Sequence, residues 1–177
     1  VDVSVGEGDV VIDGGAAWGD TALIFSAQAG TMGKVVSLEC VDEVLELFRE
    51  NMSLNPALAG RIQLVNAALW NVSNETVSFA DNGPGSRVVT SDTGDAQELS
   101  EHRTISIDDL VLDLALPRVD FIKMDIEGSE LAALQGAVHT LSTFRPKLAL
   151  SAYHRPLDII DLANYLSGLH LGYRFYL

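Results

Sequence analysis

The sequence predicts an α/β fold with a mostly parallel sheet, and three observations lead to this prediction. Short β-branched apolar runs alternate along the chain with longer stretches of helical periodicity. The connections between these runs are long enough to cross over and join parallel strands. Hydrophobic residues make up 47% of the 177 residues, enough to bury the core of one domain. We therefore expect residues 1–177 to form a single domain with helices on both faces of the sheet.

The first half of the chain alternates strands and helices in the order β-α-β-α-β. Each predicted strand is a short apolar run, and each predicted helix ends at a glycine or at an Asn-Pro pair. In chain order, the elements are strand Asp9–Asp13, helix Trp18–Ala29, strand Lys34–Glu39, helix Val41–Leu54 and strand Arg61–Leu69.

Residues 71–103 form a polar, turn-rich insertion. Within it, Val77–Ala80 and Arg87–Thr90 are predicted to pair as a hairpin, because the stretch DNGPG between them is a strong turn signal. Such an insertion either decorates the fold or covers a site.

The α/β pattern then resumes and continues to the last residue. Gly136 is expected to break or kink the helix that contains it. The predicted elements are helix Ile107–Asp113, strand Val119–Ile126, helix Ser129–Leu141, strand Pro146–Ala152, helix Leu157–Leu169 and strand Tyr173–Leu177.

The chain carries a formal net charge of −14 and a single cysteine. An acidic surface repels nucleic-acid phosphates and anionic membranes, so neither is an expected partner. One cysteine forms no internal disulfide, and the sequence has no zinc-spaced Cys/His cluster and no apolar stretch of membrane-spanning length. These features predict a cytoplasmic protein, and they leave the oligomeric state open.

The stretch VIDGGAAWGD joins the first predicted strand to the first predicted helix. It places Asp13, Gly15 and Gly19 in the pattern acid-x-Gly-x-x-x-Gly, at a turn where open α/β sheets bind ligands. The dinucleotide fingerprint and the phosphate-binding loop both fail here, because position 16 is alanine and Asp20 follows the last glycine. An acid beside the loop suits a cationic ligand such as S-adenosylmethionine, and we expect Trp18 and Asp20 to belong to the same site. A glycine-rich helix start without a ligand is the alternative.

Glu39 ends the second predicted strand, roughly 20 residues beyond the last glycine of the loop. This is the separation at which an acid accepts hydrogen bonds from both ribose hydroxyls of a nucleoside. Asn66 and Ala67 end the third strand, where an adenine ring would lie in this topology. An acid that caps the following helix is the alternative for Glu39.

A second stretch, VDFIKMDIEGSELAALQGA at 119–137, contains KMDIEG followed by E-L-x-x-L-x-G. Together with VIDGGAAWGD, VVSLEC and RPKLALSAYH, it resembles the FkbM-type methyltransferases over nearly the whole chain. The resemblance implies a Rossmann-like class I methyltransferase fold of three layers, S-adenosylmethionine as cofactor, and O-methylation of sugars or other hydroxyls. It also implies a last antiparallel strand that this chain lacks, so we expect a truncation before it. Because Ser151 and Ala152 stand where many relatives carry a glutamate, no catalytic glutamate is assigned there.

Four residues are candidates for the chemistry. Alternation places Lys123, Asp125 and Glu127 on one face of the fourth strand and its exit, where buried charges are costly unless they are paired. Asp125 and Glu127 would hold the methionine ammonium of the cofactor or orient the acceptor hydroxyl, whereas a self-satisfied Lys123–Asp125 pair is the structural alternative. His154, after the fifth strand, is the candidate general base. No metal is assigned, although a divalent ion at Asp125, Glu127 and His154 is conceivable.

The sequence therefore predicts a methyltransferase that uses S-adenosylmethionine and modifies a hydroxyl of a small molecule or sugar. Two alternatives remain open. One is a non-catalytic module that binds S-adenosylmethionine, and the other is a nucleotide-dependent oxidoreductase on a similar sheet, which the missing dinucleotide fingerprint disfavours.

Overall fold

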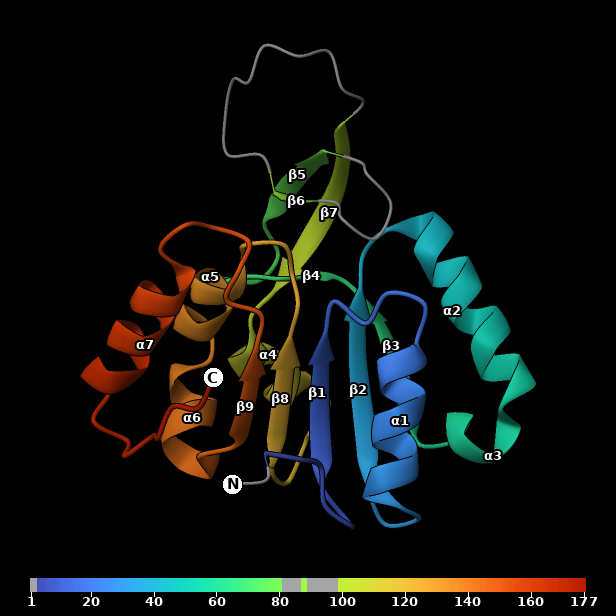
Figure 1. Ribbon diagram of the computed structural model, residues 1–177. Coiled ribbons are helices and arrows are strands. Elements are labelled where there is room, and N and C mark those ends of the chain that lie inside the picture. The colour runs from blue at the N-terminus through green and yellow to red at the C-terminus, as the bar shows by residue number, and fades with distance from the viewer. Residues whose placement is uncertain (1–2, 81–86, 89–98) are drawn as a thin grey trace.

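A computed structural model describes residues 3–80, 87–88 and 99–177. The main sheet has five parallel strands in the order β3-β2-β1-β8-β9 (Figure 1). Its strands are β1 (Val10–Gly14), β2 (Lys34–Glu39), β3 (Ile62–Asn66), β8 (Phe121–Met124) and β9 (Lys147–Leu150). The predicted α/β fold with a mostly parallel sheet is confirmed.

Helices cover both faces of this sheet, as the two largest core clusters show. Side chains of α1 and α2 pack on one face, and those of α4 to α7 pack on the other. The helices are α1 (Asp20–Ala29), α2 (Asp42–Leu54), α3 (Pro56–Ala59), α4 (Ile107–Asp113), α5 (Glu130–Gln135), α6 (Val138–Phe144) and α7 (Asp158–Gly168).

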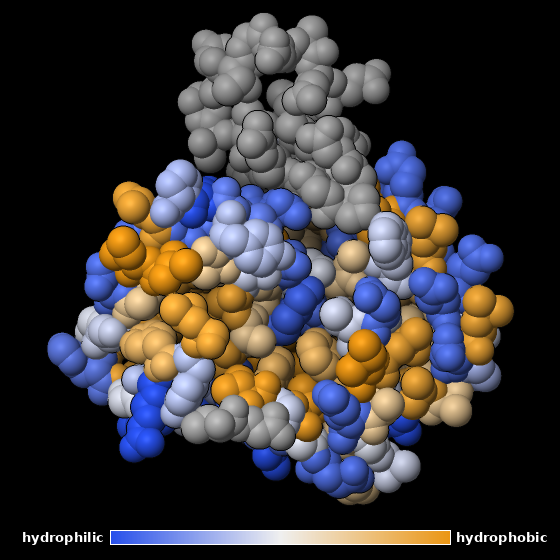
Figure 2. Space-filling model, in the orientation of Figure 1, coloured by the Kyte–Doolittle hydropathy of each residue, from blue (hydrophilic) through white to orange (hydrophobic). Residues whose placement is uncertain are grey.

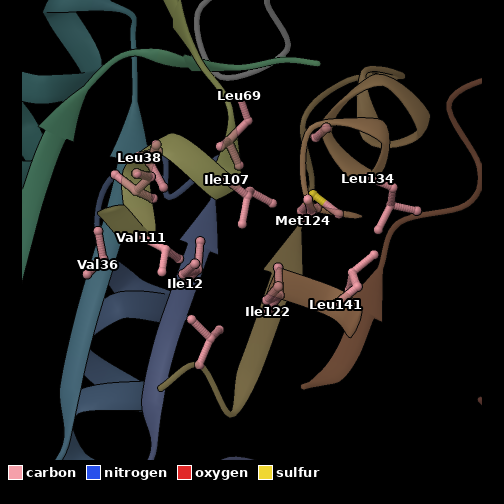
Figure 3. Close-up of a cluster of buried hydrophobic side chains, with 14 of the residues drawn as sticks. Ile12, Val36, Leu38, Leu69, Ile107, Val111, Ile122, Met124, Leu134 and Leu141 are labelled. Atoms are coloured by element: carbon pink, nitrogen blue, oxygen red, sulfur yellow. The ribbon is translucent and has the colours of Figure 1, made fainter. Parts of the chain in front are cut away.

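The alternation of side chains along β1 supplies both clusters. Ile12 is fully buried against α4 to α7, where it joins Ile122 and Leu134 (Figure 3). Val11, its neighbour in the chain, points the other way and packs with Phe48 of α2. Because both faces of a parallel sheet are covered, its strands are near-continuous apolar runs, which explains why the sequence revealed them.

A second sheet of four strands, in the order β4-β7-β5-β6, extends from the carboxyl end of the main sheet (Figure 1). Its strands are β4 (Ala68–Leu69), β5 (Thr76–Ala80), β6 (Arg87–Val88) and β7 (Leu99–Ile105). The antiparallel pairing of β5 with β6 agrees with the predicted hairpin, while the stretch DNGPG and residues 89–90 lie outside the described residues.

Two strand predictions are wrong. The segment Arg61–Leu69 is not one strand, because pairing with β2 stops at Asn66 and Ala68–Leu69 then pairs with β7 of the second sheet. The segment Tyr173–Leu177 forms no strand; these residues line a largely hydrophobic groove with β9 and α7 (Figure 2).

The predicted break at Gly136 is confirmed, since α5 ends before it and α6 begins after it. A Cβ atom at this position would lie 2.4 Å from the carbonyl oxygen of Trp70, so only glycine lets the two segments approach. Among the described residues, no helix has the length and apolar character needed to cross a membrane.

Candidate functional site

The order of the strands reverses between β1 and β8. The chain builds outward from β1 through β2 to β3, and then returns to place β8 and β9 on the opposite side of β1. Open α/β sheets bind their ligands at the carboxyl ends of the strands beside such a reversal. Here the loops that follow β1 and β8 meet, and the backbone N–H of Asp125 donates to the carbonyl of Gly14 at 3.1 Å. The candidate site therefore lies at this edge.

The glycines of the first loop let the chain pack closely against itself. Gly15 has a φ of +67°, and a Cβ atom there would lie 2.0 Å from the carbonyl oxygen of Asp125. Gly19 has a φ of +84°, and its Cβ atom would lie 2.9 Å from side-chain atoms of Phe48 and Met52. Both positions therefore require glycine for backbone conformation and for space. The neighbours that demand glycine are parts of this chain, so a ligand is not needed to explain them.

An ion pair between Asp13 and Lys123 supports this loop. Asp13 is fully buried, accepts a hydrogen bond from the hydroxyl of Thr21 at 2.8 Å, and lies 3.3 Å from Lys123 Nζ. Lys123 also donates to the loop carbonyls of Gly14 and Gly15, at 3.2 and 2.8 Å. Burial raises the pKa of Asp13, and the Lys123 ammonium acts in the opposite direction.

The partner of Lys123 is thus Asp13 rather than Asp125. The two side chains meet because β1 and β8 pair with Asp13 opposite Lys123. Their contacts hold the glycine loop in place. A direct contact of Asp13 with the cofactor, and a catalytic role of Lys123, stay predictions.

Glu39 is turned toward the backbone around it. Its Oε1 accepts hydrogen bonds from the N–H groups of Cys40 and Val41, at 2.8 and 3.0 Å, directly before α2. Its Oε2 accepts from the N–H of Ala17 in the glycine loop at 3.1 Å. In this structure Glu39 therefore links the loop to the residues just before α2, and it does not cap the helix itself. A contact of Glu39 with the ribose stays a prediction.

The other predicted cofactor residues lie around the same edge. Trp18 is 47% exposed, and its carbonyl accepts a hydrogen bond from Asn51 of α2. Asp20 is exposed in the first turn of α1. Asn66 is exposed and stands opposite Glu39 in the pairing of β2 with β3, whereas Ala67 is buried.

A second cluster forms where β8 and β9 end, and it unites three of the predicted catalytic residues. His154 Nε2 lies 3.3 Å from Asp125 Oδ1 and 3.4 Å from Glu127 Oε2. The hydroxyl of Tyr153 donates to Asp125 at 3.1 Å, and the ring of Tyr153 lies 4.5 Å from that of His154 between centroids. A donor, two carboxylates and an imidazole thus converge beside the glycine loop.

Sequence reasoning missed a third carboxylate of this cluster. Glu130 begins α5, its side chain is 1% exposed, and its Oε1 lies 3.1 Å from His154 Nδ1. The same oxygen accepts a hydrogen bond from the N–H of Ile126 at 2.9 Å, and burial raises the pKa of this carboxyl. An acid in the first turn of a helix is readily explained by the helix dipole, so the sequence alone does not single it out.

The backbone between Asp125 and Glu130 has an unusual conformation. Glu127 has a φ of +54° and the following Gly128 has a φ of +91°. A glutamate in the left-handed region is uncommon, and such strain persists where the surrounding structure imposes it, often at functional sites. This turn brings Glu127 back to within reach of His154.

The family model of the methyltransferase FkbM domain matches residues 4–175. The chain belongs to the FkbM methyltransferase family. This confirms the family that the sequence resembled, and with it the Rossmann-like fold. Among curated proteins, none matches the chain.

Solved structures agree with this assignment. Methyltransferase FkbM from Methylobacillus flagellatus KT is similar with a TM-score of 0.69 and 27% identity, over 91% of this chain and 37% of that one. An S-adenosylmethionine-dependent O-methyltransferase from Thermotoga maritima has a TM-score of 0.55 at 15% identity, over 94% and 46% of the two chains. Fibrillarin from Aeropyrum pernix has a TM-score of 0.52 at 13% identity, over 95% and 59%. The last two similarities establish the fold alone.

Proposed function

We propose that this chain is the catalytic domain of a methyltransferase that uses S-adenosylmethionine and transfers the methyl group to a hydroxyl of a small molecule or sugar. Membership of the FkbM family supports the reaction class. The observation that carries the proposal is the cluster of Asp125, Glu127 and His154 directly beside the glycine loop. Fibrillarin from Aeropyrum pernix, which shares the fold, holds natively bound S-adenosyl-L-methionine.

The residues at this edge fit the charge of the cofactor. S-adenosylmethionine supplies a methyl group on a sulfonium, and it also carries an ammonium. Asp125 follows β8, its backbone contacts the glycine loop, and its side chain is 36% exposed, so the carboxylate is accessible to a cationic group. Trp18 and Asp20 on the loop, and Glu39, Asn66 and Ala67 along the edge, are the residues proposed to hold the nucleoside.

The cluster around His154 is the place where the acceptor hydroxyl is proposed to lie. An attacking hydroxyl must lose its proton as its oxygen bonds to the methyl carbon, so a group that takes the proton has to stand nearby. His154 is the proposed base. Because three carboxylates surround its ring, the cluster as a whole controls where that proton goes.

Calorimetric titration of the chain with S-adenosylmethionine and S-adenosylhomocysteine, with NAD as a control, tests the cofactor. We expect both sulfur compounds to bind, NAD not to bind, and Glu39→Ala to weaken binding at least tenfold. Glu46→Ala, at an exposed acid of α2, is the matched control. Preferential binding of NAD would replace the proposal with an oxidoreductase.

A screen of hydroxyl acceptors with methyl-labelled cofactor tests the reaction. His154→Ala is expected to reduce transfer while leaving cofactor affinity unchanged. If the cofactor binds and no hydroxyl compound is methylated, the chain is better described as a module that binds S-adenosylmethionine.

A further inference from the structure

The cluster at His154 contains more negative charge than its one imidazole neutralises. Asp125, Glu127 and Glu130 each bring a carboxylate oxygen to within 3.4 Å of the ring. With all three ionised, the group carries a net charge of −2 when His154 is protonated and −3 when it is neutral. Like charges at such distances repel one another, and the cost grows where burial excludes water.

Two buried atoms of the cluster lack a hydrogen bond. The side chain of Glu130 is 1% exposed, and its Oε2 has no hydrogen-bond partner among the described residues. His154 Nδ1 lies 3.1 Å from Glu130 Oε1, yet the part of the chain that is described offers it no aligned hydrogen bond either. Buried polar atoms are nearly always paired, so these two orphaned atoms indicate an absent partner. Since one is a carboxylate oxygen, a cation suits it.

The geometry of the three side chains fits a metal ion. Asp125, Glu130 and His154 each offer one ligand atom, and these atoms lie within 4.8 Å of one another. Bonds of about 2.1 Å to Mg²⁺ or Mn²⁺ place two ligand atoms at most about 4.2 Å apart, so the cluster has to close around the ion. Asp125 lies at Nε2 of His154 and Glu130 at Nδ1, and one ion binds a single ring nitrogen, so the imidazole also has to turn. Carboxylates suit Mg²⁺ and Mn²⁺, and the imidazole favours Mn²⁺ of the two.

We propose that Asp125, Glu130 and His154 bind a divalent metal ion, Mn²⁺ in preference to Mg²⁺, with Glu127 as a nearby carboxylate that neutralises its charge. The three side chains come from the end of β8, the start of α5 and the segment after β9, so the fold assembles the site only when the sheet is complete.

The role of the ion rests on the proposed function. The site coincides with the place proposed for the acceptor hydroxyl, and a divalent ion lowers the pKa of an oxygen that it binds. Methyl transfer forms the O–CH₃ bond and breaks the S–CH₃ bond, whose electron pair stays on sulfur. The hydroxyl proton leaves to Glu127, whose side chain is 33% exposed and can release it to solvent. In the metal-bound form His154 is a ligand, so Glu127 takes the place of His154 as the proposed base.

Titration of the whole chain with Mn²⁺ tests the site without any acceptor. The protein is first stripped with EDTA and desalted, and binding is followed by calorimetry and by loss of the electron paramagnetic resonance signal of free Mn²⁺. We expect one equivalent to bind, and we expect Glu130→Gln to weaken binding at least tenfold. Glu46→Gln, at an exposed acid of α2, is expected to bind as the unmodified chain does.

The design separates the possible failures. If Glu130→Gln does not fold, Asp125→Asn at the more exposed ligand makes the same test. Absence of Mn²⁺ binding, or binding that both Glu130→Gln and Asp125→Asn leave unchanged, overturns the inference. Cofactor titration in EDTA is run in parallel: cofactor binding without Mn²⁺ binding refutes the metal site alone, and Mn²⁺ binding without cofactor binding refutes the proposed function alone.

Discussion

Two charged clusters lie at the same edge of the sheet, and their partners differ. In the first, Asp13 is paired with Thr21 and Lys123, and Lys123 also binds two loop carbonyls. Asp13 Oδ1 makes no aligned hydrogen bond with the described residues, but it lies 3.3 Å from the Lys123 ammonium. In the second, three carboxylates surround His154, and buried atoms of Glu130 and His154 lack hydrogen bonds among the described residues. The first cluster neutralises its own charge, whereas the second is left acidic.

This difference separates support of the fold from capacity for chemistry. A buried ion pair in which the lysine also binds backbone carbonyls holds a loop, and removing one partner leaves an uncompensated buried charge. A cluster whose buried polar atoms lack partners can bind a ligand and contributes little to stability. Substitutions in the first cluster should therefore lower the free energy of unfolding, and those in the second should alter ligand binding.

The largest effect is expected for Lys123→Met. It leaves Asp13 buried without its cation, and the free energy of unfolding should fall by about 3–5 kcal/mol, measured by denaturant titration. Because burial already raises the pKa of Asp13, and this variant removes the cation that lowers it, the folded state should lose stability as pH rises through that raised value. The loss should thus be larger at neutral pH than near pH 4.

The double variant Asp13→Asn/Lys123→Met is the control for charge, since it removes both members of the pair. It should recover part of the lost stability. Equal losses in the single and double variants would mean that the cluster acts through packing, and the contrast between the two clusters would weaken.

Gly15→Ala should have the next largest effect. Its new Cβ atom would collide with the carbonyl of Asp125, at a φ that alanine avoids. We expect a loss of about 2–3 kcal/mol from strain and overpacking. Gly60→Ala is the matched control, because a Cβ atom at Gly60 meets nothing within 4 Å and its φ is −61°. Thermal unfolding of both variants would contradict the prediction if their midpoints agreed.

Glu130→Gln should not lower the free energy of unfolding as Lys123→Met does, although Glu130 is more deeply buried than most acids. In protein freed of metal, it replaces a buried carboxylate in an acidic cluster by a neutral amide that can still accept from the Ile126 N–H. The free energy of unfolding should stay the same or rise by about 1 kcal/mol. A loss comparable to that of Lys123→Met, in the same denaturant titration, would place Glu130 among the residues that hold the fold.

The sequence predicted most of the main sheet because its strands are local signals. Runs such as Val10–Gly14 are short, β-branched and covered on both faces, so composition and length identify them. Only the hairpin of the second sheet was predicted, because β7 (LSEHRTI) is polar and pairs with the distant β4 and β5. Tyr173–Leu177 has the composition of a strand, yet composition does not supply a pairing partner.

The candidate site was predictable to the extent that topology fixes it. Asp125, Glu127 and His154 follow neighbouring strands, so the strand order alone brings them to one edge. The partner of Lys123 was missed because it depends on the register of β8 against β1. Glu130 was missed because its burial arises from the packing of α5 on the sheet, which a linear pattern does not contain.

The smallest loss of stability is expected for Glu39→Gln, which tests whether Glu39 supports the fold, as Asp13 does, or binds a ligand. An amide oxygen can replace one carboxylate oxygen toward the N–H groups of Cys40 and Val41, while the bond to the Ala17 N–H is lost. The free energy of unfolding should fall by about 0.5–1 kcal/mol.

Cofactor titration of the same variant distinguishes the two possible roles of Glu39. If Glu39 only links the glycine loop to α2, the affinity for S-adenosylmethionine should follow that small loss in stability and fall less than about threefold, since 0.5 kcal/mol corresponds to roughly a twofold change in affinity. If its carboxylate accepts hydrogen bonds from two ribose hydroxyls, the amide leaves one of them without an acceptor, and the affinity should fall tenfold or more. We expect the second result, and the affinity of Glu39→Ala for S-adenosylmethionine should be lower still. When an acid both positions a loop and binds a ligand, removal of its charge weakens ligand binding before it disturbs the loop.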